Sequence, residues 1–203
     1  MNDKDMHFPE TADIETSSDG YAGRFAGPTG EWFLWVQERI ALSMLAEAAT
    51  GGTSNVERRT LNAELSILDV GGGHGQLAGP LCREGYRVTV VGSDQSCAGR
   101  IAGLIADGKC AFKVGNLVEL PFDDRSFDVV LCFRFLPHCE RWPKLVSELC
   151  RVAKTTVIAD YPSSRSFNAI VPLFFGAKKR VEKNTREWTT FRHSDILGEF
   201  SKN

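Results

Sequence analysis

Short apolar runs alternate with amphipathic stretches along the middle of the chain. The apolar runs have the length of single strands, the amphipathic stretches have helical spacing, and they alternate over residues 65–70, 76–84, 86–92, 97–106, 109–114, 127–133, 142–152 and 155–159. Strands that alternate with helices in this way form a parallel sheet whose right-handed crossovers place helices on both faces. The pattern therefore predicts an α/β fold with a doubly wound parallel sheet.

The first sixty residues follow a different pattern. Residues 1–20 are acidic and polar without an apolar period, so we expect a disordered tail there. A glycine-rich strip comes next and leads into an amphipathic helix over residues 31–49. We therefore expect a lid strip and a covering helix over residues 21–62, ahead of a main domain over residues 63–203.

Composition limits the kind of protein this can be. The 203 residues carry 24 Lys and Arg against 26 Asp and Glu, and this formal net charge of −2 gives no field to attract nucleic acid. No apolar run approaches the roughly 20 residues that span a bilayer, and the acidic start is unlike a signal peptide. The six cysteines form no C-x-x-C pair. We expect a cytoplasmic protein without bound metal, nucleic acid or stable membrane insertion.

A glycine-rich loop follows the first apolar run of the main domain. The segment ILDVGGGHG has the pattern D-x-G-x-G-x-G, with Asp69 before Gly71 and Gly73. Glycines leave no Cβ between the backbone and a ligand, and a helix that starts behind them favours an anionic group. Residues 73–78 also fit the dinucleotide pattern G-x-G-x-x-A, with Asp94 about 20 residues further on. A carboxylate at Asp69 repels a pyrophosphate but helps to hold the ammonium group of an amino acid.

Three ordered motifs resemble those of the Rossmann-like, or class I, S-adenosylmethionine-dependent methyltransferases. They are ILDVGGGHG, then VVGSDQS with Asp94, and then the region that contains LPFDDRSFDVV and continues to the following helix. The likeness runs from about residue 66 to residue 160 and is fainter beyond. It implies the strand order 3-2-1-4-5, S-adenosylmethionine as cofactor and S-adenosylhomocysteine as product.

The resemblance also assigns roles to individual residues. It implies that Asp69, Gly71 and Gly73 meet the methionine end of the cofactor and that Asp94 binds its ribose. Around the adenine it implies roles for Gln95, for the amide oxygen of Asn116, where the family usually has an aspartate, and for the backbone of Leu117. Phe133 would flank the sulfonium. His138, just beyond the fourth apolar run, is the candidate general base.

The acceptor is less well defined by the sequence. Residues 161–192 are apolar and then basic, which suggests a lid over a small-molecule or lipid-like substrate. The chain ends before the family's usual C-terminal antiparallel hairpin, so we expect a possible homodimer that covers the edge of the fifth strand. Two other functions stay open: an NAD-binding oxidoreductase, and a non-catalytic module that binds S-adenosylmethionine.

Overall fold

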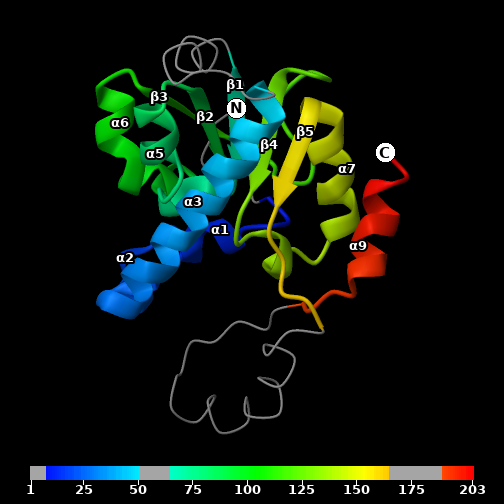
Figure 1. Ribbon diagram of the computed structural model, residues 1–203, viewed down its shortest axis with the longest axis horizontal. Coiled ribbons are helices and arrows are strands. Elements are labelled where there is room, and N and C mark those ends of the chain that lie inside the picture. Colours follow the sequence, from blue (N-terminus) through cyan, green and yellow to red (C-terminus); the bar gives the residue numbers. More distant parts are fainter. Residues whose placement is uncertain (1–7, 51–64, 165–188) are drawn as a thin grey trace, which may run out of the picture.

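Five strands form a single parallel sheet in the computed structural model, which describes residues 8–50, 65–164 and 189–203. The strand order is β3-β2-β1-β4-β5 (Figure 1), and each of the four pairings is parallel. The predicted fold class and strand order are therefore confirmed. The strands are β1 (Ser66–Val70), β2 (Arg87–Gly92), β3 (Cys110–Val114), β4 (Phe127–Cys132) and β5 (Ala153–Ala159).

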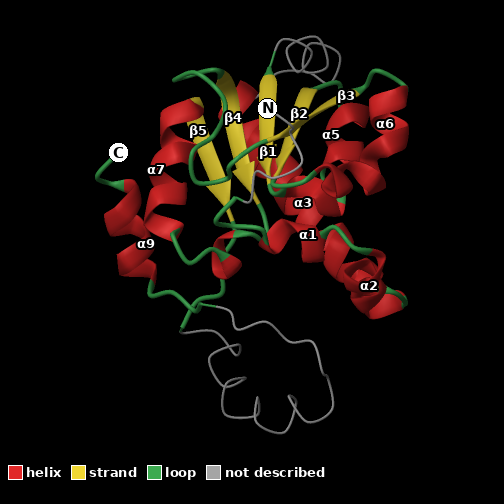
Figure 2. Cartoon of the chain, turned by 180° about the vertical axis from the view of Figure 1, so that it is seen from behind, coloured by secondary structure: helices red, strands yellow, loops and turns green. Residues whose placement is uncertain are grey.

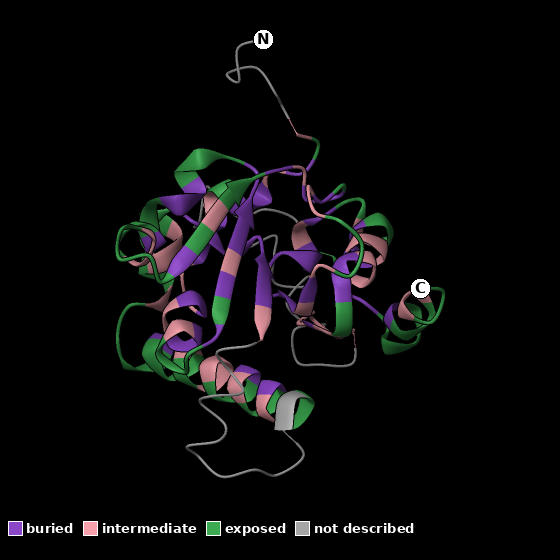
Figure 3. Cartoon of the chain, turned by 90° about the horizontal axis from the view of Figure 1, so that it is seen from above, coloured by how far each residue is buried: buried purple, intermediate pink, exposed green. Residues whose placement is uncertain are grey.

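Helices cover both faces of the sheet (Figure 2). On one face Leu45 and Leu81 pack against Ile67, and on the other Leu149 and Ile196 belong to the same core cluster as Leu68. Ile67 and Leu68 are neighbours in β1, so their side chains point to opposite faces and both are fully buried. Figure 3 shows that the strands are not equally buried: the burial is greatest in β1 and β4, whereas β3 and β5 at the two edges are partly exposed. The covering helices are α3 (Pro28–Thr50), α5 (Ala78–Arg83), α6 (Ala102–Ala106), α7 (Trp142–Val152) and α9 (His193–Phe200).

Most of the predicted elements occur within a few residues of their expected bounds. The main difference falls in residues 97–106, where the structure has the 3-10 helix η3 (Gln95–Ile101) followed by the short helix α6. Asp94 is the N-cap of η3, and its carboxylate accepts the Ser96 backbone N–H. Two further 3-10 turns, η2 (Gly72–His74) and η4 (Leu136–His138), follow β1 and β4.

The acidic N-terminal segment is more ordered than the sequence predicts. It contains α1 (Ala12–Thr16) and α2 (Asp19–Ala22), followed by the 3-10 turn η1 (Gly23–Phe25). Asp13 is fully buried and accepts hydrogen bonds from the backbone N–H (2.6 Å) and the hydroxyl of Ser93. The prediction of a disordered tail is therefore wrong for the described residues from 8 to 20, because the carboxylates find donors far away in the sequence.

Glu10 provides a second anchor for this segment. Its carboxylate accepts the backbone N–H groups of Arg141 at 2.9 Å and Glu140 at 3.3 Å, directly before α7. A carboxylate at this position satisfies amide groups that have no partner within the helix. The N-terminal segment is thus fastened to β2 on one side and to α7 on the other.

The C-terminal predictions are only partly described by the structure. Residues 165–188, which make up most of the predicted lid, lie outside the described residues. Among the described strands, β5 is paired with β4 alone, and Ser163 forms an isolated parallel bridge with Phe191 just beyond it. In the described ranges we find no helix with the length and apolar character needed to cross a membrane.

Candidate functional site

The carboxyl ends of β1 and β2 carry the glycine loop and Asp94. Gly71 has φ +70°, in the left-handed region that favours glycine, and its N–H donates to the Val91 carbonyl at 2.9 Å. At Gly73 an added Cβ would lie 2.3 Å from Ser17 Oγ and 2.6 Å from the Cys97 carbonyl oxygen. The loop therefore needs glycine at Gly71 for its left-handed backbone conformation and at Gly73 for close packing.

Asp69 lies at the centre of the sheet, in β1 between Val90 of β2 and Leu131 of β4. Its side chain is fully buried, and neither carboxylate oxygen has a hydrogen-bond partner among the described residues. Desolvation by burial raises the pKa of this carboxyl to about 7. A buried carboxylate without a partner is costly, so this position fits a ligand that brings a positively charged donor such as an ammonium group.

Asp94 is exposed where β2 ends, and its Oδ1 accepts the Ser96 N–H at 2.8 Å. Hydrogen bonds from the side chain and backbone of Ser96 hold the pKa of Asp94 below its usual value. The carboxylate is therefore ionised at neutral pH and held in one orientation. Gln95 follows it on the same surface and is also exposed.

Asn116 and Leu117 follow β3 at the same edge of the sheet. The side-chain oxygen of Asn116 accepts the Val118 N–H at 3.1 Å, so this amide shapes its own loop. The side chain of Leu117 is fully buried in the core that contains Val91, which leaves only its backbone for a ligand. A carbonyl oxygen has a second lone pair, so the Asn116 amide retains capacity for one further hydrogen bond.

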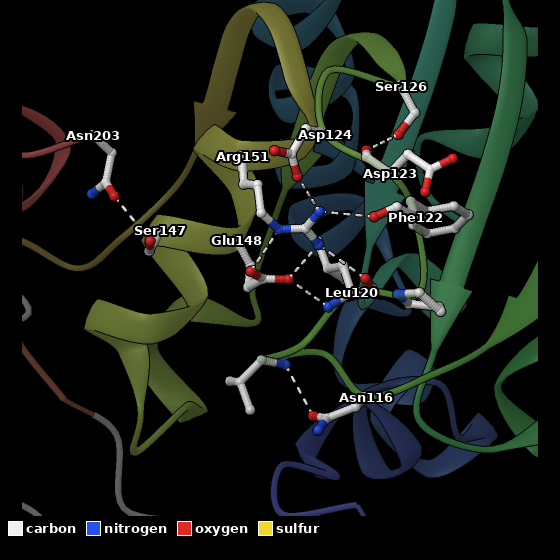
Figure 4. A network of polar contacts seen from close by, with 12 residues as sticks. Asn116, Leu120, Phe122, Asp123, Asp124, Ser126, Ser147, Glu148, Arg151 and Asn203 are labelled. Atoms are coloured by element: carbon white, nitrogen blue, oxygen red, sulfur yellow. Dashed lines mark hydrogen bonds and ion pairs between the residues drawn. The ribbon is translucent and has the colours of Figure 1, made fainter.

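Arg151 in α7 fastens the end of the loop that follows β3 (Figure 4). Its Nη1 donates to Asp124 Oδ1 and to the Phe122 carbonyl, both at 2.8 Å, and its Nη2 donates to the Leu120 carbonyl at 3.0 Å. Glu148 Oε2 accepts from Arg151 Nη2 and from the Leu120 N–H, both at 2.7 Å. The network thus connects α7 to the loop that carries two of the candidate ligand-binding residues.

We expect Arg151→Met to lower the free energy of unfolding by about 2 kcal/mol. Several hydrogen bonds to a charged group are lost, and their value is reduced because the Arg151 side chain is 31% exposed. Urea unfolding measures the effect. The control is Arg83→Met, which removes a surface pair with Glu38 and should change stability by less than about 0.5 kcal/mol. Equal effects of the two substitutions would contradict this role for Arg151.

Two adjoining cavities lie beyond β4 and β5, with volumes of about 280 Å³ and about 340 Å³. Phe25, Arg134 and Asp160 line both of them. The predicted residue His138 lines the smaller cavity, and the predicted residue Phe133 lines the larger one. The other lining residues are Tyr21, Pro137, Tyr161 and Pro162 in the smaller cavity, and Phe33, Val36, Gln37 and Ile40 in the larger.

The structure thus gathers the predicted residues along one edge of the sheet. The first strand, β1, contains Asp69 and is followed by Gly71 and Gly73. The next two strands are followed by Asp94 and Gln95 (β2) and by Asn116 and Leu117 (β3), and β4 is followed by Phe133 and His138. The sequence reading missed Arg134, Asp160 and Gln37. Asp160 directly follows β5, as Asp94 follows β2, and the same rule that favours strand ends could have found it.

Residues 68–158 match the model of a family described as "Methyltransferase domain". A ubiquinone biosynthesis O-methyltransferase from Rickettsia typhi is 31% identical over 99 residues, which are 48% of this chain and 40% of that protein. Its counterpart from Rickettsia bellii is 26% identical over 147 residues, covering 70% of this chain and 61% of that protein. The matched part of the chain thus spans less than two thirds of these curated relatives.

Solved structures resemble the whole fold at lower identity. The magnesium protoporphyrin IX methyltransferase from Synechocystis PCC 6803, solved with bound SAH, has a TM-score of 0.68 and 17% identity. The match covers 94% of this chain and 86% of that one. A likeness at this level of identity shows a shared fold.

Proposed function

We propose that the protein transfers a methyl group from S-adenosylmethionine to a small-molecule acceptor, because residues 68–158 match the model of a family described as "Methyltransferase domain". The observation that carries the proposal is the buried, unpartnered Asp69 carboxylate beside a glycine loop. A pyrophosphate would place negative charge next to this carboxylate, whereas the amino-acid end of S-adenosylmethionine brings an ammonium group.

The residues along the strand ends fit the different parts of this cofactor. We assign the ammonium group to Asp69, the methionine end to the loop at Gly71 and Gly73, and the ribose hydroxyls to Asp94. For the adenine we assign Gln95, the Asn116 amide and the Leu117 backbone, and for the sulfonium the ring of Phe133. The product S-adenosylhomocysteine keeps every one of these groups except the transferred methyl and its charge.

The cofactor supplies a methyl group on a positively charged sulfur. The protein's task is then to align an acceptor atom with that methyl group and to keep water out of the line between them. Orientation of this kind contributes about 7–11 kcal/mol in well-aligned pairs. The two cavities beyond β4 and β5 provide the space for the acceptor, next to Phe133 and His138.

His138 is our candidate general base for a hydroxyl acceptor, because it lines the smaller cavity. We expect His138→Ala to lower kcat by about 10²-fold, the lower end of the usual range for a base, while S-adenosylhomocysteine affinity stays within about twofold. Single-turnover methyl transfer and calorimetry measure the two quantities. Added imidazole should restore part of the rate. An unchanged kcat would remove His138 from the mechanism.

Calorimetric titration with S-adenosylmethionine, S-adenosylhomocysteine and NAD tests the cofactor directly. We expect micromolar binding of the two adenosyl sulfur compounds and no binding of NAD. The reverse selectivity would return residues 73–78 to the dinucleotide interpretation. Binding followed by no methyl transfer to any acceptor would favour a non-catalytic module.

The relatives' O-methyltransferase name and the aromatic lining of the cavities support a hydroxyl-bearing aromatic or lipid-like acceptor.

We propose a cytoplasmic location, which fits the absence of a membrane-crossing helix among the described residues. We also propose that a second copy covers the edge of β5 that has no strand partner among the described residues. Equilibrium sedimentation of the purified chain tests the dimer, and a monomer at all concentrations would rule it out.

A further inference from the structure

Two buried hydrogen-bond donors without partners meet at the larger cavity. One is Nη1 of Arg134, directly after β4, and the other is Nε2 of Gln37, on α3. Neither atom has a hydrogen-bond partner among the described residues, and both side chains line the cavity of about 340 Å³. Because buried donors are normally paired, such a pair indicates a ligand that brings acceptor atoms.

The orientation of both donors is fixed by contacts between the two side chains. Arg134 Nη2 donates to Gln37 Oε1 at 2.7 Å, so the amide oxygen is used and the amide nitrogen is left over. The guanidinium also lies over the ring of Phe25, with Cζ 4.1 Å from the ring centre. The Arg134 Nη1 and Gln37 Nε2 donors are therefore held in place by two neighbouring elements.

The backbone at Arg134 is also unusual. Its φ is +61°, in the left-handed region that non-glycine residues seldom adopt, and its N–H donates to Asp160 Oδ1 at 2.6 Å. Strain of this kind concentrates at functional sites. Asp160 thus holds the main chain of Arg134, and among the described residues no carboxylate forms an ion pair with the guanidinium itself. Asp160 and Tyr21 both favour the charged guanidinium electrostatically, while among the described residues Nη1 itself has no hydrogen-bond partner.

The surroundings of these donors are aromatic. Phe25, Phe33 and Phe133 line the larger cavity, and Tyr21 and Tyr161 line the adjoining one. Burial lowers the pKa of Arg134, but an arginine remains charged at neutral pH. A guanidinium beside an amide suits the two oxygens of a carboxylate, and the aromatic walls suit a flat apolar body.

We propose that Arg134 and Gln37 form the carboxylate-binding subsite of the acceptor pocket, and that the acceptor is an aromatic acid. The proposal rests on the proposed methyltransferase function and adds the substrate class. The carboxylate accepts from Arg134 Nη1 and Gln37 Nε2, and the ring lies against the aromatic walls. The amino-acid end of the cofactor also carries a carboxylate, so the test has to distinguish binding of the acceptor's carboxylate from binding of the cofactor's.

The test compares 3,4-dihydroxybenzoate with its neutral isostere 3,4-dihydroxybenzamide by calorimetry, with and without S-adenosylhomocysteine. We expect the wild-type protein to bind the acid at least about tenfold more tightly than the amide, as for a hydrogen-bonded charge pair. Arg134→Gln should remove this preference and leave the affinity for the amide within about twofold. Gln37→Leu should reduce the preference in the same direction, and thermal unfolding checks that each variant is folded.

The control is Arg39→Gln, which removes an exposed guanidinium that stacks on Trp35 outside both cavities. It should leave the preference for the acid unchanged. The proposal is overturned if the wild-type protein does not prefer the acid, or if Arg134→Gln keeps the preference. It is also overturned if Arg134→Gln weakens S-adenosylhomocysteine but not methylthioadenosine, since Arg134 would then bind the cofactor's carboxylate. Failure of the methyltransferase function appears separately, as no binding of S-adenosylhomocysteine to the wild-type protein.

Discussion

Replacing Asp94 by alanine is expected to weaken the binding of S-adenosylhomocysteine by about 10²- to 10⁴-fold. The carboxylate can accept both hydroxyl groups of the ribose, and each hydrogen bond to a charged group contributes about 1.5–3 kcal/mol. The structure supports the assignment because the carboxylate is exposed at the end of β2 and is oriented by the Ser96 N–H. Calorimetric titration of the variant measures the loss.

Asp94 also begins η3, so the loss of binding has to be separated from a loss of local structure. Asp94→Asn keeps a side-chain oxygen for the Ser96 N–H and should preserve η3 while still weakening the ligand. Asp107→Ala, at an exposed carboxylate that pairs with Lys109, should leave the affinity unchanged. A dissociation constant for Asp94→Ala equal to that of the wild-type protein would contradict the ribose assignment.

The sheet could be predicted from the sequence because its signal is local. β1 and β4 are mostly apolar and buried along nearly their whole length, as is typical of strands covered on both faces. Their alternation with helices indicates that they are parallel. Residues near the carboxyl ends of the parallel strands, such as Asp69 in β1 and Asp94 just beyond β2, then lie at one edge of the sheet. This is why the sequence could predict which residues lie together at this edge, where we propose that the cofactor binds.

The N-terminal segment could not be predicted in the same way. Asp13 and Glu10 carry the charge and polarity of a disordered tail, and what orders them are donors at Ser93 and Arg141, 80 and 131 residues away. The residues that we propose for the acceptor were missed for the same reason. Arg134 and Gln37 lie 97 residues apart, and their significance depends on which of their atoms remain without a partner after folding.

Asp69 should make the stability of the ligand-free protein depend on pH. Its pKa is about 7 in the folded state against 3.8 for an ordinary carboxyl, so the folded protein holds this proton more tightly. The contribution of Asp69 to the free energy of unfolding is therefore largest below about pH 4 and falls as pH rises to 7. The total change is about 4 kcal/mol.

His74 contributes with the opposite sign, so the effect of Asp69 has to be measured as a difference between variants. Burial, followed by the charge of Arg134, lowers the pKa of His74 to about 4, and its contribution to stability rises as pH increases from about 4 to 6.5. Urea unfolding is measured for the wild-type protein and for Asp69→Asn between pH 4 and 8. The contribution of His74 to the free energy of unfolding is the same in both proteins and cancels in the difference. The wild-type protein should lose stability relative to the variant as pH rises, whereas parallel curves would contradict the burial of an unpartnered carboxylate.

The Asp69→Asn substitution also tests how the cofactor binds. An ammonium group beside Asp69 favours the ionised carboxylate, so binding of S-adenosylhomocysteine below pH 7 should release a proton from this site. Calorimetry in two buffers with different ionisation enthalpies counts that proton. In Asp69→Asn the proton release should disappear and the affinity at pH 8 should fall by about tenfold or more, because a charge pair is replaced by a neutral contact. Unchanged proton release in the variant would mean that the ammonium group binds elsewhere. The proton release therefore tests whether Asp69 selects a zwitterionic cofactor over a dinucleotide.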